Sequence, residues 1–400
     1  LNLKINNENI LKNTKIVLKD DKDDDLYDFD DDDQIELLEE NLIGPEGGKN
    51  VLCVLFSAPL AWTDTRNQSH PIQTLDYAGE RETLIQVFHE AKHDIGLRFD
   101  FATTDALRTA VTLGCKALHF SGHGHPHCLN FEDGRSGLQF ITTEQLSELC
   151  KAGNLQLEFV FVSACYSQKA AEAFVQAGVQ HVVCVNVEAQ LLDAAAMAFT
   201  RAFYLALLVG HTVKHSFDIG KQAVATSPYV PNGVAEGNKF LLLPENELHN
   251  VPIFLAKTIR KWPSTNIALR GITTELIDHS YLPRPPEDFE GREIDMHNVI
   301  RILLNRRLVS VVGEPGVGKS AVSVGACCYL WERKHFTDGI VYVRLQGVAT
   351  YEGLLSALSQ AIMSGSPKLA KRITGLSKLF KEKIKSVMKL SPLQQQQQQQ

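Results

Sequence analysis

Two short segments contain the residues whose types and spacing could do chemistry. Residues 121–124 read Ser-Gly-His-Gly and residues 163–165 read Ser-Ala-Cys, and each segment follows an apolar stretch. A cysteine thiolate is a strong nucleophile when a base lies beside it. An imidazole titrates near neutral pH, so it can accept the thiol proton and later return it to a leaving group. The pair predicts nucleophilic catalysis by Cys165 with His123 as the base.

The surrounding pattern predicts the elements that would position this pair. Strands alternate with helices, so we expect an α/β fold with a mainly parallel sheet and helices on both faces. Sites in such sheets form outside the carboxyl ends of the strands, so His123 and Cys165 should emerge at the same edge. The predicted strands are 51–57, 97–102, 117–121, 155–163, 180–185 and 239–243, and the predicted helices are 77–93, 105–113, 143–151, 167–177, 191–208 and 212–226.

The two segments, in this order and some forty residues apart, resemble the caspase-like clan of cysteine peptidases, and within it the CHAT family with its separase-like relatives. The resemblance covers about residues 50–245 and implies a caspase–haemoglobinase fold. It implies that His123 is the catalytic imidazole, that Cys165 is the nucleophile and that the Gly124 N–H meets the oxyanion. Metacaspases of this clan have Asp two residues before the cysteine, where this chain has Ser163, so the P1 preference is left open.

Two other interpretations of these residues stay open. A CHAT domain can be a non-enzymatic docking scaffold. The series His123, His125, His127 and Cys128 also superficially resembles a metallo-β-lactamase zinc pattern, although its Asp is missing. We expect His125 and His127 at the surface near the mouth of the site. His119 has the inward phase of its strand and is expected in the core. His181, Cys53, Cys115, Cys150 and Cys184 are expected to be core or packing residues.

A second motif lies further along the chain. Residues 313–320 read Gly-Glu-Pro-Gly-Val-Gly-Lys-Ser, which matches the phosphate loop G-x-x-x-x-G-K-[S/T]. Its glycines let successive N–H groups curl around phosphate oxygens, and the helix that follows adds a favourable dipole. Lys319 should reach the β- and γ-phosphates, and Ser320 should bind Mg²⁺. The predicted cofactor is ATP or ADP with Mg²⁺, held by Gly313, Gly316, Gly318, Lys319 and Ser320.

The context of this loop predicts the start of a switch ATPase. Strands are expected at 308–312 and 339–344, with helices at 295–305, 320–334 and 352–363. Together with Phe289–Glu293 upstream, this pattern resembles the NB-ARC/STAND class of P-loop NTPases over about 285–363. No apolar strand ending in Asp-Asp follows Ser320, so the second carboxylate motif needed for hydrolysis is absent from this sequence.

Charge and composition set the outer limits. The 400 residues are 44% apolar with a net charge of −7, but residues 20–40 carry ten Asp and three Glu, and residues 368–389 carry eight Lys or Arg. A general nucleic-acid partner is therefore not indicated. Eight scattered cysteines and no apolar run long enough to span a bilayer favour an intracellular, cytoplasmic protein without a membrane span.

We expect five regions: a disordered acidic segment (1–48), a CHAT/caspase-like domain (49–245), a linker with a proline-rich end (246–290), a partial P-loop NTPase (291–365) and a basic and polyglutamine tail (366–400). Both ends look cut, so the sequence is expected to be a fragment. This organisation predicts a cysteine-type endopeptidase joined to an ATP-binding switch in a signalling protein. Its partners would be a protein substrate or signalling protein, with self-association through the ATPase module.

Overall fold

The computed structural model describes residues 50–151, 157–186, 189, 191–255, 269–271, 282–286, 288–336 and 340–365. The histidine segment, the cysteine segment and the phosphate loop all lie inside these ranges. The predicted acidic segment (1–48) and the predicted basic and polyglutamine tail (366–400) lie outside them.

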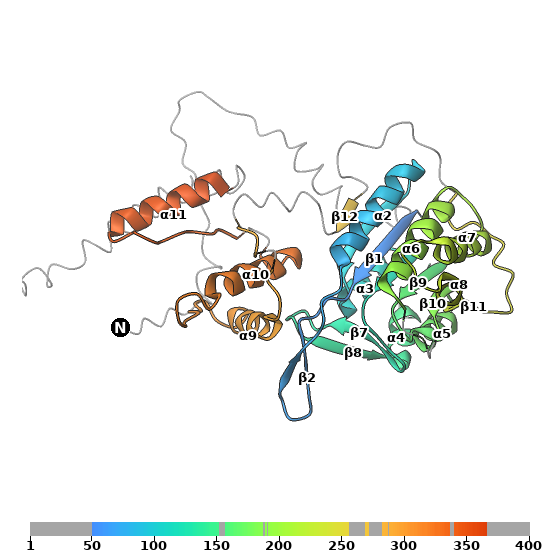
Figure 1. The fold of residues 1–400 in the computed structure, drawn as a ribbon, viewed down its shortest axis with the longest axis horizontal. Coiled ribbons are helices and arrows are strands. Elements are labelled where there is room, and N and C mark those ends of the chain that lie inside the picture. The colour runs from blue at the N-terminus through green and yellow to red at the C-terminus, as the bar shows by residue number, and fades with distance from the viewer. Residues whose placement is uncertain are drawn as a thin grey trace, which may run out of the picture. The chain divides into compact units, whose positions relative to one another are not determined.

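The central element is a seven-stranded sheet with the strand order β11-β10-β9-β5-β1-β4-β12 (Figure 1). Its neighbouring strands pair in parallel, except that β11 runs antiparallel to β10. The bounds are β1 Val51–Phe56, β4 Gly96–Phe101, β5 Ala117–Ser121, β9 Phe159–Ser163, β10 His181–Val185, β11 Phe240–Leu243 and β12 Leu269–Gly271. The prediction of a mainly parallel sheet is confirmed.

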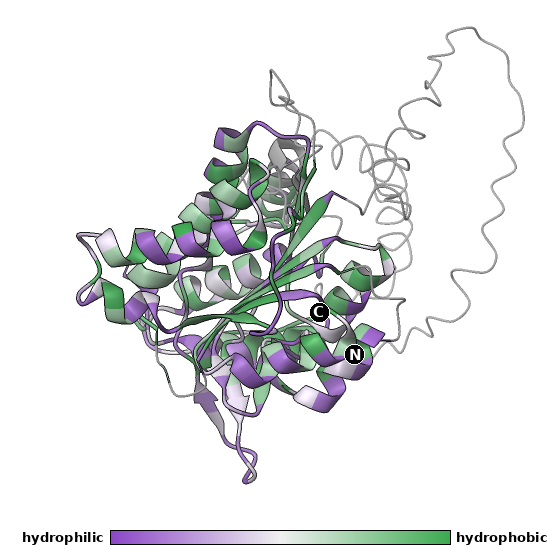
Figure 2. Cartoon of the chain, turned by 90° about the vertical axis from the view of Figure 1, so that its right-hand side faces the viewer, coloured by the Kyte–Doolittle hydropathy of each residue, from purple (hydrophilic) through white to green (hydrophobic). Residues whose placement is uncertain are grey.

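The central strand β1 explains why the sheet lies between two layers of helices. All six of its residues are buried, as expected for a parallel strand covered on both faces. Leu52, Val54 and Phe56 pack into one apolar cluster with α2 Tyr77–Ala91, α6 Asp193–Leu208 and α7 Val213–Thr226. Cys53 and Leu55 point into the opposite cluster with α3 Thr104–Thr112, α4 Thr143–Lys151 and α5 Gln168–Ala177. Figure 2 shows the apolar strands between these two layers.

Two small sheets, which the sequence pattern did not predict, belong to loops that begin at the carboxyl edge of the main sheet. A hairpin of β2 Ala61–Thr63 and β3 Ser69–Pro71 lies between β1 and α2. A three-stranded sheet of β6 Gly124–His125, β7 Cys128–Glu132 and β8 Leu138–Thr142 lies between β5 and α4. These insertions build the surroundings of the histidine segment.

The predicted linker 246–290 also contributes to the first domain. Ile253 and Phe254 are buried in the same cluster as β1 and α2, so the packing extends beyond the predicted boundary at 245. Further on, β12 pairs in parallel with β4 and forms the edge of the main sheet. A short helix, α8 Gly233–Gly237, precedes β11.

The predicted phosphate-loop domain is only partly present in the described residues. Three of its predicted helices form, as α9 Glu293–Leu303, α10 Lys319–Glu332 and α11 Tyr351–Gly365. The predicted strand at 308–312 is wrong: these residues are irregular, and Leu308 and Val312 are 82% and 85% exposed. No strand forms in the described part of 339–344 either. An apolar run becomes a stable strand only beside a partner, and the described residues provide none here.

None of the helices in the described ranges combines the length and apolar character that a bilayer crossing requires.

A buried pair of histidines ties the start of β10 to the segment after β11. The two Nδ1 atoms of His181 and His249 lie 2.7 Å apart, and Nε2 of His249 donates to the Pro244 carbonyl oxygen at 2.9 Å. His249 therefore accepts at Nδ1, and His181 donates. Burial, followed by the nearby His249, lowers the pKa of His181 to about 4.

This pair predicts a loss of stability in mild acid. The unfolded chain takes up a proton on His181 near its ordinary pKa of about 6.5, whereas the folded chain does so only near 4. The free energy of unfolding should therefore fall as pH drops from about 6.5 towards 4, by on the order of 1 kcal/mol from this residue between pH 7 and 5. Urea unfolding at both pH values should show a smaller fall for His181→Gln. The matched change at exposed His211, His211→Gln, should keep the wild-type fall, and an equal fall in all three proteins would contradict the prediction.

Candidate active site

The register of two neighbouring strands places the two predicted catalytic residues just beyond adjacent strand ends. Ser121, the last residue of β5, pairs with Ser163, the last residue of β9. His123 and Cys165 each lie two residues beyond these ends, on adjacent parallel strands. The connection after β1 leads to β4 on one side, whereas the connection after β5 leads to β9 on the other. Ligands bind at such a switch point in open α/β sheets, so the position as well as the residue types favours a site here.

Gly124 lies directly against the backbone of the cysteine. A Cβ atom at Gly124 would lie 1.7 Å from the Cys165 carbonyl oxygen, so only glycine allows this approach. A Cβ at Gly122 would likewise lie 2.7 Å from the Cβ of Ser57. Neither glycine has a positive φ. The two glycines are therefore needed for close packing and not for the left-handed turn that a Gly-x-Gly sequence would allow.

The imidazole of His123 is held by a main-chain carbonyl. Its Nε2 lies 2.6 Å from the carbonyl oxygen of Gln73, in the segment between β3 and α2. Because a carbonyl only accepts, Nε2 carries the proton and Nδ1 is left as the base. Sequence reasoning missed Gln73, since a backbone carbonyl acts regardless of residue type and leaves no signal in the sequence.

Cys165 lies in the tight turn that leads from β9 into α5. Its side chain is half-buried, and the main-chain N–H of Leu191 points at Sγ from 3.4 Å. The next residue, Tyr166, has φ 57°, a left-handed conformation that a tyrosine rarely adopts. The buried Ser167 hydroxyl donates to Val162 O and accepts from the Val185 N–H, which fixes the turn. Strained turns of this kind concentrate at functional sites.

The buried cysteines of the first domain have the surroundings of structural thiols, apart from Cys115, whose pKa is lowered by a hydrogen bond with Cys53. All eight cysteines of the chain are free, and those of the first domain other than Cys165 are buried. Burial raises the pKa of Cys150 to about 12 and also raises the pKa of Cys128 and Cys184. A raised pKa keeps a thiol protonated and unreactive. Cys165 is the one cysteine of this domain that is both accessible and placed beside a histidine segment.

A buried polar network supports the end of β5 from below. His119 is fully buried, as predicted, and its Nε2 lies 3.0 Å from a carboxylate oxygen of Glu80 on α2. The other Glu80 oxygen accepts from the hydroxyl of Ser121. The Tyr204 hydroxyl lies 2.9 Å from Nδ1 of His119, and burial raises the pKa of Tyr204 well above its usual value. That hydroxyl therefore stays protonated, and both ring nitrogens of His119 have partners.

The metal alternative gains no support from the geometry. His125 and His127 are exposed, as predicted, and Nδ1 of His127 lies 3.3 Å from the Lys169 ammonium. A cation in this position competes with a metal ion. Within the described ranges, no group of three or more His, Cys, Asp or Glu side chains is arranged to hold one.

The phosphate loop has a local conformation that suits anions. Gly316 and Gly318 have φ angles of 82° and 89°, and α10 begins at Lys319. The Lys319 ammonium donates to the carbonyl oxygens of Gly313 and Glu314, at 3.0 and 2.7 Å. Ser320 is exposed in the first turn of α10. The loop and the helix N-terminus therefore fit a phosphate group, although the strand expected in front of the loop does not form.

The comparison with known families decides the assignment of the first domain. A sequence model of the CHAT domain matches residues 9–254, which is more than half of the chain. The chain belongs to the CHAT domain family. This membership supports a caspase-like cysteine peptidase domain, in agreement with the mostly parallel sheet.

Solved structures show only weak likenesses to this CHAT chain. The Arg-specific cysteine proteinase gingipain R is 15% identical with a TM-score of 0.37, covering 54% of this chain and 50% of its own. A complex of the Porphyromonas gingivalis RgpB pro- and mature domains is 15% identical with a TM-score of 0.34, covering 54% of this chain and 50% of its own. Staphylococcus aureus pyridoxal kinase is 12% identical with a TM-score of 0.24, covering 46% of this chain and 93% of its own. The chain thus spans about half the length of the gingipain structures. No curated protein sequence matches it.

The close approach at Gly124 generates a prediction for the CHAT site. Gly124→Ala would place a methyl group against the Cys165 carbonyl, and the backbone must move to relieve the clash. We expect reaction of Cys165 with an electrophilic peptide probe to fall at least tenfold, because a displacement of about 1 Å at a site can cost 10²-fold. Labelling rates followed by mass spectrometry test this. In Gly237→Ala, where the nearest atom would be 3.1 Å away, labelling should keep the wild-type rate. A normal rate in Gly124→Ala would show that the approach is irrelevant.

Proposed function

We propose that the CHAT domain is a cysteine-type endopeptidase in which Cys165 is the nucleophile and His123 is the base. The observation that carries this proposal is the pairing of Ser121 with Ser163 at the ends of neighbouring strands. His123 and Cys165 each follow these ends by two residues. The packing of Gly124 on the Cys165 backbone supports it further.

The mechanism follows from the partners of each group. Nδ1 of His123 accepts the thiol proton while its Nε2–H stays on the Gln73 carbonyl. Sγ attacks the scissile carbonyl carbon, and the negative charge on the carbonyl oxygen is stabilised by the N–H groups of Gly124 and Cys165. The imidazolium returns the proton to the departing amine, which leaves a thioester on Cys165. Water, deprotonated by His123, hydrolyses the thioester and restores the free thiol.

We also propose a nucleotide site at residues 313–320, for ATP or ADP with Mg²⁺, in an intracellular signalling protein. The positive φ angles of Gly316 and Gly318 and the helix start at Lys319 support it, because a glycine turn in front of a helix N-terminus allows backbone N–H groups to face an anion. Lys319 would hold the β- and γ-phosphates, and Ser320 would bind Mg²⁺, which neutralises phosphate charge when present. The proposal is limited to nucleotide binding.

The peptidase proposal predicts selective labelling of one cysteine. Electrophilic peptide probes with Lys, Arg or Asp at P1 should modify Cys165 faster than a small-thiol control, and the preferred probe gives the P1 class. Cys165→Ala should abolish labelling, and His123→Ala should slow it by 10²- to 10⁴-fold, the usual contribution of a general base. Cys327→Ala, at another half-buried cysteine, should leave it unchanged. If no probe reacts faster than the small thiol, the domain is a scaffold.

The nucleotide proposal predicts a loss of binding on removal of one ammonium group. Lys319→Ala should weaken Mg·ATP binding by about ten- to a hundredfold, which corresponds to one charge-assisted hydrogen bond. Isothermal titration calorimetry measures this directly. Arg306→Ala, at an exposed cation of the same unit, should bind like the wild type. Equal affinities in all three proteins, or no binding in any, would refute a phosphate site at this loop.

A further inference from the structure

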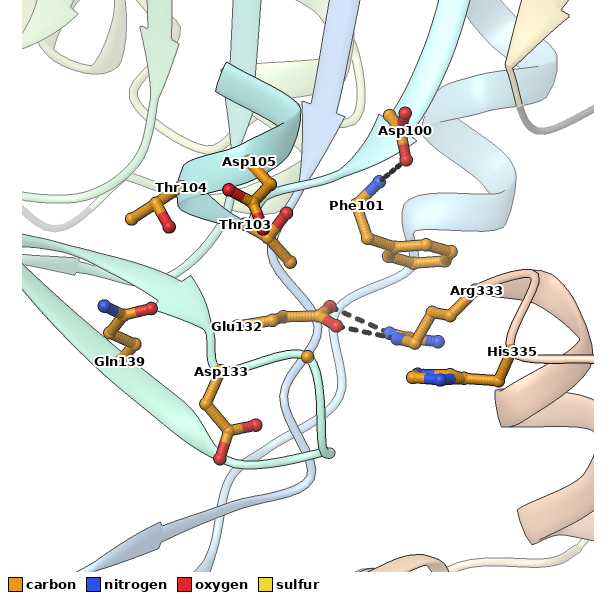
Figure 3. A pocket seen from close by; sticks show the side chains of 11 residues that line it. Asp100, Phe101, Thr103, Thr104, Asp105, Glu132, Asp133, Gln139, Arg333 and His335 are labelled. Carbon is orange, nitrogen blue, oxygen red and sulfur yellow. Dashed lines mark hydrogen bonds and ion pairs between the residues drawn. The ribbon is translucent and has the colours of Figure 1, made fainter. Parts of the chain in front are cut away.

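The end of α10 is attached to the CHAT domain through a buried arginine. The side chain of Arg333 is 5% exposed, and that of its partner Glu132, on β7, is fully buried. Nε and Nη2 of Arg333 donate to the two Glu132 oxygens at 2.6 and 2.8 Å, a bidentate pair. Figure 3 shows the two Glu132 carboxylate oxygens facing the Arg333 guanidinium, with the Phe101 ring nearby. The centroid of the Phe101 ring lies 3.6 Å from the guanidinium carbon.

The same arginine reaches the segment that follows β1. Nη2 of Arg333 also donates to the Ala58 carbonyl oxygen at 3.1 Å, and the Ala58 N–H donates to Glu132 at 2.9 Å. The preceding residue, Ser57, donates its N–H to the Ser121 carbonyl oxygen, and its side chain packs on Gly122. Arg333 is therefore two contacts away from the turn that carries His123.

A second connection runs through Leu60. Its side chain lies in an apolar cluster with Ile300 of α9 and Leu330 of α10. The Leu60 carbonyl oxygen accepts from the Ile72 N–H at 3.0 Å, and the next residue, Gln73, supplies the carbonyl that holds His123. The segment 57–73 thus contacts the histidine segment at both its ends, and it contacts the α9–α10 region through Ala58 and Leu60.

Further contacts join the α9–α10 pair to the CHAT domain; we call this contact region the seam. The Tyr77 hydroxyl donates to Glu332 at 2.8 Å, and Nδ1 of His297 on α9 lies 2.9 Å from the buried Ser136 hydroxyl. A cavity of about 280 Å³ beside Arg333 is lined by residues from both sides of the seam. Its acidic side chains are accounted for by their neighbours, and we assign it no ligand.

We infer that the α9–α10 pair is a positioning element of the CHAT site, with Arg333 as the residue that fixes segment 57–73 and, through Gln73, the imidazole of His123. Because α10 begins at the phosphate loop and ends beside Arg333, one rigid helix connects the two proposed sites. This inference rests on the peptidase proposal for its activity readout only. The position of His123 is a structural quantity that can be measured without it.

The test compares Arg333→Met, Arg333→Lys and the matched control Arg307→Met, at an exposed arginine of the same unit, in the full chain. Arg333→Met removes the guanidinium and keeps the stem, whereas Arg333→Lys keeps a charge but loses the bidentate fork. With the preferred peptide probe, we expect the maximal inactivation rate of Cys165 to fall at least tenfold in Arg333→Met and by less in Arg333→Lys. The half-saturating probe concentration should not change, since Arg333 does not contact the probe.

The second readout is the ¹⁵N NMR signature of His123, assigned by comparison with His123→Ala. In the wild type and in Arg307→Met, Nε2 should carry the proton; in Arg333→Met, the two tautomers should mix. Wild-type tautomers and inactivation rates in both Arg333 variants would overturn the inference. If the wild type does not label, the peptidase proposal fails and NMR alone decides the inference. If Arg333→Met does not fold, Arg333→Lys decides it by the same two measurements.

Discussion

The register between β5 and β9 is the constraint on which the candidate site depends. Ser121 and Ser163 pair at the ends of these strands, so His123 and Cys165 each follow their strand end by two residues. Side chains alternate with a period of two along a strand, so a slip of one residue would turn every side chain of one strand to the opposite helix layer. The two buried clusters prevent such a slip, because each accepts only its own set of β5 and β9 side chains.

A buried carboxylate holds α2 against the end of β5. A carboxylate in a closed interior is stable only when its oxygens are hydrogen-bonded. Glu80 meets this requirement through His119 and Ser121, which belong to the same strand, two residues apart. These two hydrogen bonds to Glu80 therefore hold α2 and the end of β5 in one arrangement. This explains why a buried histidine and a buried serine are found in β5, which ends two residues before His123.

Elements that are determined by nearby residues could be predicted from the sequence. Elements that depend on contacts with distant parts of the chain could not. The central strands β1, β5 and β9 and the helices around them follow from continuous or periodic apolar runs. The small strands β2 and β6 are short and have exposed residues, so no pattern marks them. Gln73 acts through its backbone. The run at 308–312 has the composition of a buried strand, yet composition cannot supply the neighbouring strand that would bury it.

The two proposed sites therefore differ in what their geometry depends on. The conformation of the phosphate loop comes mainly from Gly316, Gly318 and the helix that begins at Lys319, with one further hydrogen bond from Arg292 to the Val317 carbonyl oxygen at 2.7 Å. It forms although Leu308 and Val312 in front of it stay exposed. The peptidase geometry instead requires parallel pairing between strands about forty residues apart, together with a carbonyl from residue 73. A local motif keeps its shape when its surroundings are incomplete, whereas the His123–Cys165 site exists only when the whole sheet has folded.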